Sequence, residues 1–105
     1  MSCDHLACRI PAILRPADVD AVVIATRPGG AVLHARVYHA GRFIGSVMDR
    51  GFTPFTAHRD DWVPAWDVFA GGNHVAARLP DMAAAVAKLC DHVAWASFHA
   101  RMALH

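Results

Sequence analysis

The sequence predicts an α+β domain in which an antiparallel sheet of four or five strands packs against one long C-terminal helix. Between residues 20 and 79, short apolar or alternating segments are separated by glycine-containing turns, the pattern of consecutive antiparallel strands. From residue 81 to residue 105, apolar residues recur at helical spacing without an intervening proline or glycine. A length of 105 residues suits one hydrophobic core, so we expect a single domain over residues 1–105.

Residues 1–19 contain two prolines and little periodicity, so we expect an irregular N-terminal arm with a short strand near Leu6–Ile10. The first strand is predicted at Asp20–Thr26, where five consecutive apolar residues precede a turn signal. That turn is Arg27–Gly30, of sequence RPGG. Proline presets φ at its first central position and glycine supplies a positive φ at the second, which predicts a type II turn.

Alternating apolar and polar residues predict the remaining strands of a meander over residues 20–79. In Ala31–His39 we expect one face to carry Leu33, Ala35 and Val37. The turn Ala40–Gly41 then connects this strand to Arg42–Met48 in a hairpin. A second hairpin is predicted from Trp66–Ala70, through Gly71–Asn73, to His74–Leu79. In the last strand we expect Val75, Ala77 and Leu79 to face the core. The alternate residues His74, Ala76 and Arg78 are expected to face the solvent.

Residues 49–64 form a long loop with no clear periodicity, although four aromatic residues lie in it or just after it: Phe52, Phe55, Trp62 and Trp66. Loops longer than about 12–15 residues are uncommon in compact domains and are often functional. A compact loop whose aromatic residues pack on one another is the alternative. Both interpretations remain open from the sequence.

The C-terminal helix is predicted over residues 81–104, with Asp81 as its N-cap. On a helical wheel, one stripe collects the residues expected to face the sheet: Met82, Val86, Leu89, Val93, Ala96, Ala100 and Leu104. Trp95, Phe98 and Met102 fall on the opposite side of the wheel. Burying three such side chains would stabilise a folded state or a complex by about 6 kcal/mol, so we expect them to be covered by something.

Three explanations for these three residues remain open. A break in the helix near Asp91 or His92 would turn them toward the core. The N-terminal arm or the aromatic loop could fold over them. Alternatively, they form an interface with a second copy or with another protein, since aromatic residues and methionine are enriched in interface cores.

Composition excludes several classes of protein. The apolar fraction is 55% and the mean hydropathy is +0.27, yet no uninterrupted apolar run approaches the ~18 residues of a membrane span. The net charge of +1 gives little general attraction for nucleic acid. The first residues lack the pattern of a signal peptide and the three cysteines are an odd number. We therefore expect a cytoplasmic protein with reduced thiols.

The sequence contains residues that could bind zinc or catalyse a reaction, but not in a pattern typical of either. Cys3, His5 and Cys8, with Cys90 or His92, could supply zinc ligands, but their spacing matches no zinc-binding pattern, so we expect no metal and no cofactor. An acid–base pair in His58–Asp61, with Ser46 or Ser97 as nucleophile, would make a small enzyme. No surrounding motif supplies the base and the orienting group that such a nucleophile needs, so we expect no enzymatic activity.

A second candidate surface is the solvent-facing side of the sheet, which would carry basic and aromatic residues: His34, Arg36, Tyr38, Arg42, His74 and Arg78. Arginine contacts to phosphates and stacking on an aromatic ring could bind nucleic acid there. The alternative is an ordinary solvated face of an antiparallel sheet, which the low net charge favours.

Three segments, Gly41–Val47 (GRFIGSV), Trp66–Leu79 (WDVFAGGNHVAARL) and Pro80–Leu89 (PDMAAAVAKL), describe a short meander closed by one helix. This architecture resembles the small orphan proteins of phages and mobile elements, among them anti-CRISPR proteins. The resemblance implies a non-enzymatic, phage-derived inhibitor that covers a surface of a bacterial defence complex, and it transfers no functional residues. Strands followed by a helix also resemble the DNA-binding domain of tyrosine integrases, against which the weak charge counts.

The sequence therefore predicts a protein-binding surface. Its apolar anchor is expected to comprise Trp95, Phe98 and Met102 of the helix, with Phe55 and Trp62 of the loop. Its polar rim is expected to comprise Arg59, Asp60 and Asp61. The partner is a host protein complex, and a homodimer through the C-terminal helix is the other expected assembly. The alternative function is nucleic-acid binding through Arg36, Tyr38, Arg42 and Arg78.

Overall fold

The structure is a computed structural model, and it describes residues 13–51 and 63–103. Its elements, in chain order, are one 3₁₀ turn, five strands and one helix: η1 (Pro16–Asp18), β1 (Asp20–Thr26), β2 (Val32–His39), β3 (Arg42–Asp49), β4 (Trp66–Ala70), β5 (Asn73–Leu79) and α2 (Met82–Ala103). The predicted strand near Leu6–Ile10 lies outside the described residues, as do residues 52–62 of the long loop.

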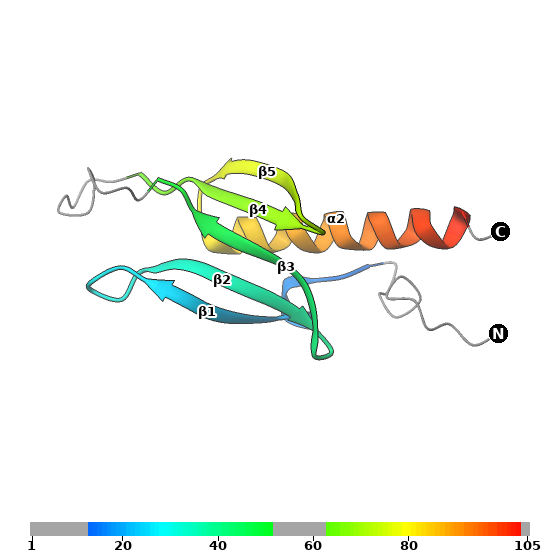
Figure 1. Ribbon diagram of the computed structural model, residues 1–105, viewed down its shortest axis with the longest axis horizontal. Helices are drawn as coiled ribbons and strands as arrows, with labels where there is room; N and C mark the ends of the chain where they lie inside the picture. Colours follow the sequence, from blue (N-terminus) through cyan, green and yellow to red (C-terminus); the bar gives the residue numbers. More distant parts are fainter. Residues whose placement is uncertain (1–12, 52–62, 104–105) are drawn as a thin grey trace.

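The five strands form one antiparallel sheet in the order β1-β2-β3-β4-β5, each paired with its neighbour in sequence. Helix α2 lies across one face of this sheet and packs mainly against β3, β4 and β5 (Figure 1). The predicted α+β class, with an antiparallel sheet and one C-terminal helix, is therefore confirmed. No helix within residues 13–51 and 63–103 is long and apolar enough to cross a membrane.

The turns follow from their glycines. Gly29 has φ +102° and the Gly30 N–H donates to the Arg27 carbonyl oxygen at 2.9 Å, as a type II turn over Arg27–Gly30 requires. Between β2 and β3, Ala40 and Gly41 both have positive φ, at 48° and 79°. Two central residues with positive φ are the mark of a type I′ turn, whose twist matches that of a hairpin. Gly71 and Gly72 connect β4 to β5 in the same manner.

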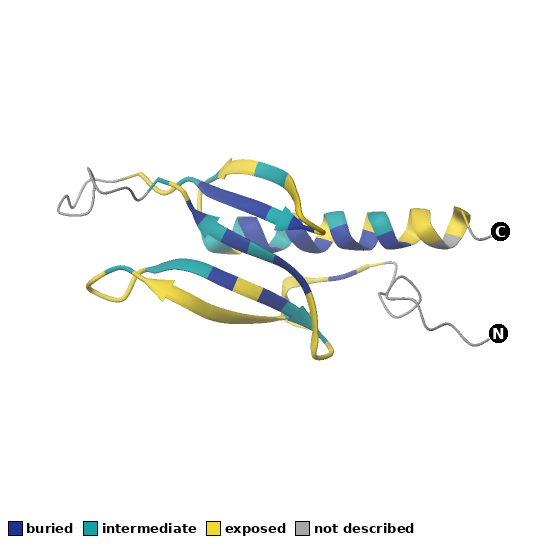
Figure 2. Cartoon of the chain, viewed as in Figure 1, coloured by how far each residue is buried: buried dark blue, intermediate teal, exposed yellow. Residues whose placement is uncertain are grey.

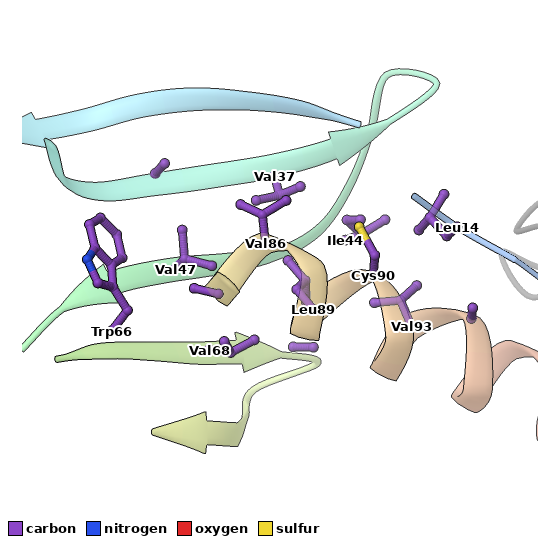
Figure 3. Packing of buried hydrophobic residues seen from close by; sticks show 14 residues of the cluster. Leu14, Val37, Ile44, Val47, Trp66, Val68, Val86, Leu89, Cys90 and Val93 are labelled. Carbon is purple, nitrogen blue, oxygen red and sulfur yellow. The ribbon is translucent and has the colours of Figure 1, made fainter. Parts of the chain in front are cut away.

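The core lies between α2 and the helix-facing side of the sheet. Val37, Val47, Val68 and Leu89 are fully buried, and Figure 3 shows the strand residues pointing toward the helix. The alternation predicted for β2 is observed, because Ala35 and Val37 are buried whereas Arg36 between them is exposed. Along β2, alternate residues therefore face the core and the side of the sheet away from α2, whereas all seven residues of β1 are exposed.

A β-bulge in β3 brings the helix close to the sheet. Val37 pairs with Gly45 and Tyr38 pairs with Phe43, which leaves Ile44 as the extra residue. Ile44 is consequently buried on the same side as Gly45. A Cβ atom on Gly45 would lie 2.6 Å from Leu89 Cδ1 and 2.5 Å from the Phe69 carbonyl oxygen. Only glycine, which has no side chain, allows α2 to approach β3 this closely.

The helix begins as predicted and is continuous from Met82 to Ala103. Its N-cap is Asp81, whose Oδ1 accepts the Ala84 N–H at 2.7 Å. The predicted stripe is only partly correct, because Val86, Leu89 and Val93 are buried whereas Ala100 is exposed. The other buried residues of the helix are Ala85, Cys90, Ala94 and Ser97. Burial stops at Ser97 because the helix extends beyond the sheet from there on (Figure 1).

The faces predicted for β5 are also partly wrong. Ala76, expected to face solvent, packs against the core, and Ala77, expected to face the core, is exposed. The register accounts for the difference, since β5 contributes an extra residue at two places along its pairing with β4. Arg78 has φ +60°, which changes the direction of the strand just before Leu79. Two irregularities thus break the simple alternation on which the expectation rested.

The two ends of the long loop are held together by one carboxylate. Asp49, which is buried, accepts the Gly51 N–H at 2.9 Å and the Ala65 N–H at 3.0 Å, both on Oδ1. The Arg50 N–H also donates to the Ala65 carbonyl oxygen at 2.8 Å. These bonds fix where the chain leaves β3 and where it returns to β4.

Candidate protein-binding surface

The exposed apolar residues of α2 form the candidate site. Trp95 is 60% exposed, Phe98 47% and Met102 59%, although all three lie on a helix with a buried opposite side. We call these three residues the helix patch. Phe98 and Met102 lie beyond Ser97, where burial along α2 stops, whereas Trp95 lies just before it and shares a depression with Val75 of β5. Exposed surface predominates toward the C-terminal end of the helix (Figure 2). Side chains of this size are rarely left exposed together unless they bind something.

The chain before η1 extends the helix patch with a hollow. Leu14 is buried whereas Ile13 is 69% exposed, and both line a shallow depression of about 300 Å³. Its other lining residues belong to the helix: Asp91, Ala94, Trp95 and Phe98. The depression lies at one end of the helix patch and Met102 lies at the other. The surface therefore combines an exposed apolar side chain, Met102, at one end with an apolar hollow at the other.

A second depression, of about 370 Å³, lies on the other side of Trp95 between α2 and β5. It is lined by Val75, Lys88, Asp91, His92 and Trp95. The indole of Trp95 thus forms a ridge between two hollows. Asp91 lines both of them and gives the end of the helix patch nearer the sheet a negative charge.

His99 connects the aromatic rings of the helix patch. Its ring centroid lies 4.2 Å from that of Trp95 and 5.9 Å from that of Phe98, the latter in an edge-to-face arrangement. Such contacts favour one orientation of the rings and reduce the entropy that a partner would have to remove. The rings therefore form a partly preorganised surface.

The structure decides between some of the explanations for Trp95, Phe98 and Met102. A break near Asp91 or His92 is wrong, because α2 is one uninterrupted helix. Coverage by the N-terminal arm or the aromatic loop concerns residues 1–12 and 52–62, which are not described. The same holds for Phe55, Arg59, Asp60, Asp61 and Trp62, the loop residues predicted to belong to the site. Sequence reasoning missed Ile13 and Leu14, whose only signal is an apolar pair between two prolines.

No element of residues 13–51 and 63–103 packs on the side of the sheet that faces away from α2, and we call this side the open sheet face. Cross-strand pairing aligns Arg36, Ser46, Phe69 and His74 on it. The Phe69 and His74 rings are stacked with centroids 5.0 Å apart, and His74 Nε2 lies 3.1 Å from Asp67 Oδ2. This face therefore carries an acidic group as well as basic ones.

The basic residues predicted for this face are only partly brought together. Arg36 and Tyr38 lie on the same side of β2, two positions apart, as the alternation of a strand requires. Arg42 pairs with His39 at the end of the β2–β3 hairpin, and Arg78 lies on the irregular part of edge strand β5. The four residues therefore do not form one compact cluster.

Within residues 13–51 and 63–103, no three histidine, cysteine or acidic side chains are grouped as metal ligands. Cys90 and His92 are described, whereas Cys3, His5 and Cys8 are not. Cys90 is fully buried, and burial, assisted by the negative charges of Asp91 and Asp18, raises the pKa of its thiol. The thiol is therefore a core group and not a reactive surface group. Ser97 is buried, and His58 and its neighbours in the loop lie outside the described residues.

Comparisons with known protein families, with curated proteins and with solved structures find no match to this chain. The surface must therefore be interpreted from its own geometry.

Proposed function

We propose that this chain is a non-enzymatic binding protein that docks the helix patch onto the surface of another protein. The observation that carries the proposal is the exposure of Trp95, Phe98 and Met102 on one side of a continuous helix. Tryptophan is the residue type most enriched among side chains that dominate binding energies, and aromatic residues and methionine are enriched in interface cores. The hollow lined by Ile13, Leu14 and Trp95 offers a site for an apolar side chain of a partner.

The narrower form of the proposal is a phage-derived, anti-CRISPR-like inhibitor that acts in the bacterial cytoplasm by covering a surface of a defence complex. Its support is the small size of the domain and its apolar surface, which suits stoichiometric occlusion. Occlusion needs affinity and bulk but no catalytic group. In this form, Phe55 and Trp62 would contribute to the apolar anchor, and Arg59, Asp60 and Asp61 would form the polar rim.

The test compares the wild type with a Trp95→Ala/Phe98→Ala variant. Both side chains are about half exposed or more, so we expect the free energy of unfolding to change by less than about 1 kcal/mol. Binding to purified CRISPR effector complexes, measured by biolayer interferometry, should be lost. Protection of a phage in plaque assays on a CRISPR-carrying host should be lost with it.

The matched control is Val22→Ala/Val23→Ala. These residues lie on β1 and are 49% and 46% exposed, close to the 47% of Phe98, so the control shortens smaller apolar side chains of similar fractional exposure, on an edge strand away from α2. Target binding should survive in this control. A helix-patch variant that unfolds at a much lower temperature than the wild type would assign Trp95 and Phe98 to the core. A stable helix-patch variant that binds a target as tightly as the wild type would remove the proposal.

A second candidate function is nucleic-acid binding by the open sheet face. The observation in its favour is the alignment of Arg36 with the stacked Phe69–His74 pair on a side that α2 leaves uncovered. Anisotropy of a labelled single-stranded oligonucleotide should then show affinity that falls with salt, by about 0.7 log units per decade of salt for each phosphate contacted. Arg36→Ala should reduce that slope, whereas Arg15→Ala beside η1 should not. Absence of binding at low salt would exclude this function.

A further inference from the structure

We propose that the helix patch also binds a second copy of this chain, through antiparallel pairing of the two α2 helices. This inference rests on the proposed function, because it takes the helix patch to be a protein-binding surface, and it names a partner for it. In the pair, Trp95 of each copy packs on Phe98 of the other. Met102 of each copy enters the hollow lined by Ile13 and Asp91 of the other.

The spacing along α2 favours a helix as the partner. Trp95, Phe98 and Met102 lie at positions i, i+3 and i+7, and Lys88 and Asp91 continue the same spacing toward the sheet. This is the alternation of three and four residues that forms the seam of two helices packed side by side. A flat protein surface would not require such spacing, whereas a second helix packs its side chains into it.

The charges on this seam favour the antiparallel orientation. A parallel pair would place Lys88 opposite the other Lys88 and Asp91 opposite the other Asp91, and both contacts are repulsive. An antiparallel pair with its twofold axis between Ala96 and Ser97 separates these like charges. It also aligns the two helix dipoles in opposite directions, which is the favourable arrangement.

The same twofold axis makes the surface complementary to itself. Pairing across it places Trp95 opposite Phe98 of the second copy, and Met102 opposite Asp91. The position of Asp91 is where the hollow of about 300 Å³ opens, with Ile13 on its rim. The exposed Met102 therefore meets a cavity formed by the other copy, and this contact occurs twice in the dimer. A flexible methionine side chain suits an irregular hollow of this kind.

The available apolar area is a large part of what a stable dimer needs. From their exposed fractions, Ile13, Trp95, Phe98 and Met102 present on the order of 500 Å² of side chain per copy. This is more than half of the roughly 800 Å² per partner of a standard interface, and the exposed side chains of Asp91 and His99 add to it. The overlap spans residues 91–102 of each α2, and the helix extends past the sheet from Ser97 on (Figure 1).

The experiment is sedimentation equilibrium of the full chain over a range of concentrations, for the wild type, Trp95→Ala/Phe98→Ala and the Val22→Ala/Val23→Ala control. We expect a dimer for the wild type and for the control. For the helix-patch variant we expect a folded monomer whose dimer dissociation constant is raised at least about tenfold. A monomeric wild type at the highest concentration would overturn the inference. A dimer that is lost in the β1 control and kept in the helix-patch variant would overturn it as well, because it would locate self-association on β1.

Cross-linking tests the orientation. In a Cys3→Ser/Cys8→Ser background, which leaves only the buried Cys90, Asp91→Cys and Met102→Cys proteins are treated with a short bis-maleimide, separately and mixed. Antiparallel pairing predicts covalent dimers mainly in the mixture, whereas dimers formed equally well by each protein alone would overturn it. Failure of self-association leaves the proposed function to be judged separately, by binding of the monomer to its target.

Discussion

The closest approach of helix to sheet can be tested by adding one methyl group, through Gly45→Ala. The new Cβ would lie 2.5 Å from the Phe69 carbonyl oxygen and 2.6 Å from Leu89 Cδ1, both below the 3.0 Å that real Cβ contacts respect. Phe69 contributes backbone and Leu89 is fully buried, so neither can move without displacing β4 or α2. Overpacking of this kind costs typically about 1–3 kcal/mol, and one backbone contact together with one contact to a fully buried side chain places the expected loss at about 2–3 kcal/mol.

Urea unfolding of four proteins measures this: the wild type, Gly45→Ala, Leu89→Ala and the double variant. Leu89→Ala alone should lose about 2–5 kcal/mol through the cavity that it leaves. The double variant should lose less than the two single losses added together, because the methyl group enters the space that Leu89 vacates. The contact with the Phe69 carbonyl oxygen remains, so the relief should be partial. A Gly45→Ala protein as stable as the wild type would refute the close approach of α2 to β3.

Three further outcomes follow from the described contacts. Asp49→Ala removes the oxygen that accepts the Gly51 and Ala65 N–H groups, and should lower the free energy of unfolding in urea by about 2–3 kcal/mol. Asp49→Asn keeps an oxygen acceptor and should lower it clearly less. Equal losses in the two variants would contradict the role of this oxygen. Ala40→Asn places a residue that tolerates positive φ at the first central position of the type I′ turn. It should increase the free energy of unfolding by about 0.5–1 kcal/mol and so raise the melting temperature. A lowered melting temperature would argue against this turn type. Because burial raises the pKa of Cys90, the unfolded chain loses the thiol proton at a lower pH than the folded chain, so the stability of the wild type should fall as pH rises above the ordinary thiol pKa. Cys90→Ala should show a smaller fall in unfolding free energy between pH 7 and pH 10, and an identical fall in both proteins would exclude the effect.

The sequence by itself determined the order and type of the elements. The bounds of β1 were predicted at Asp20–Thr26, where they are found, because an apolar run and a proline–glycine turn are local signals. The same holds for the N-cap at Asp81 and for the hairpin turn at Ala40–Gly41. Helical spacing likewise predicted that Trp95 lies on the side of α2 opposite the core residues, whereas its exposure was one of several outcomes that the spacing left open.

Only the tertiary structure decided which residues face the core where strands are irregular. Whether Ala76 or Ala77 is buried depends on how β5 pairs with β4, and a bulge in that pairing leaves no trace in the sequence of either strand. The close contact of Gly45 with Leu89 joins residues that are 44 positions apart, and the glycine alone does not reveal it.

The candidate site shows the same division. The helix patch was predicted, but the hollow beside it was not, because it forms only where Ile13 and Leu14 meet α2 from the other end of the chain. Burial along α2 ends at Ser97 although the apolar stripe continues, since the length of the sheet, and not that of the helix, limits the core. Local patterns thus determine elements and faces, whereas contacts between distant segments determine which faces meet a neighbour and which remain available for binding.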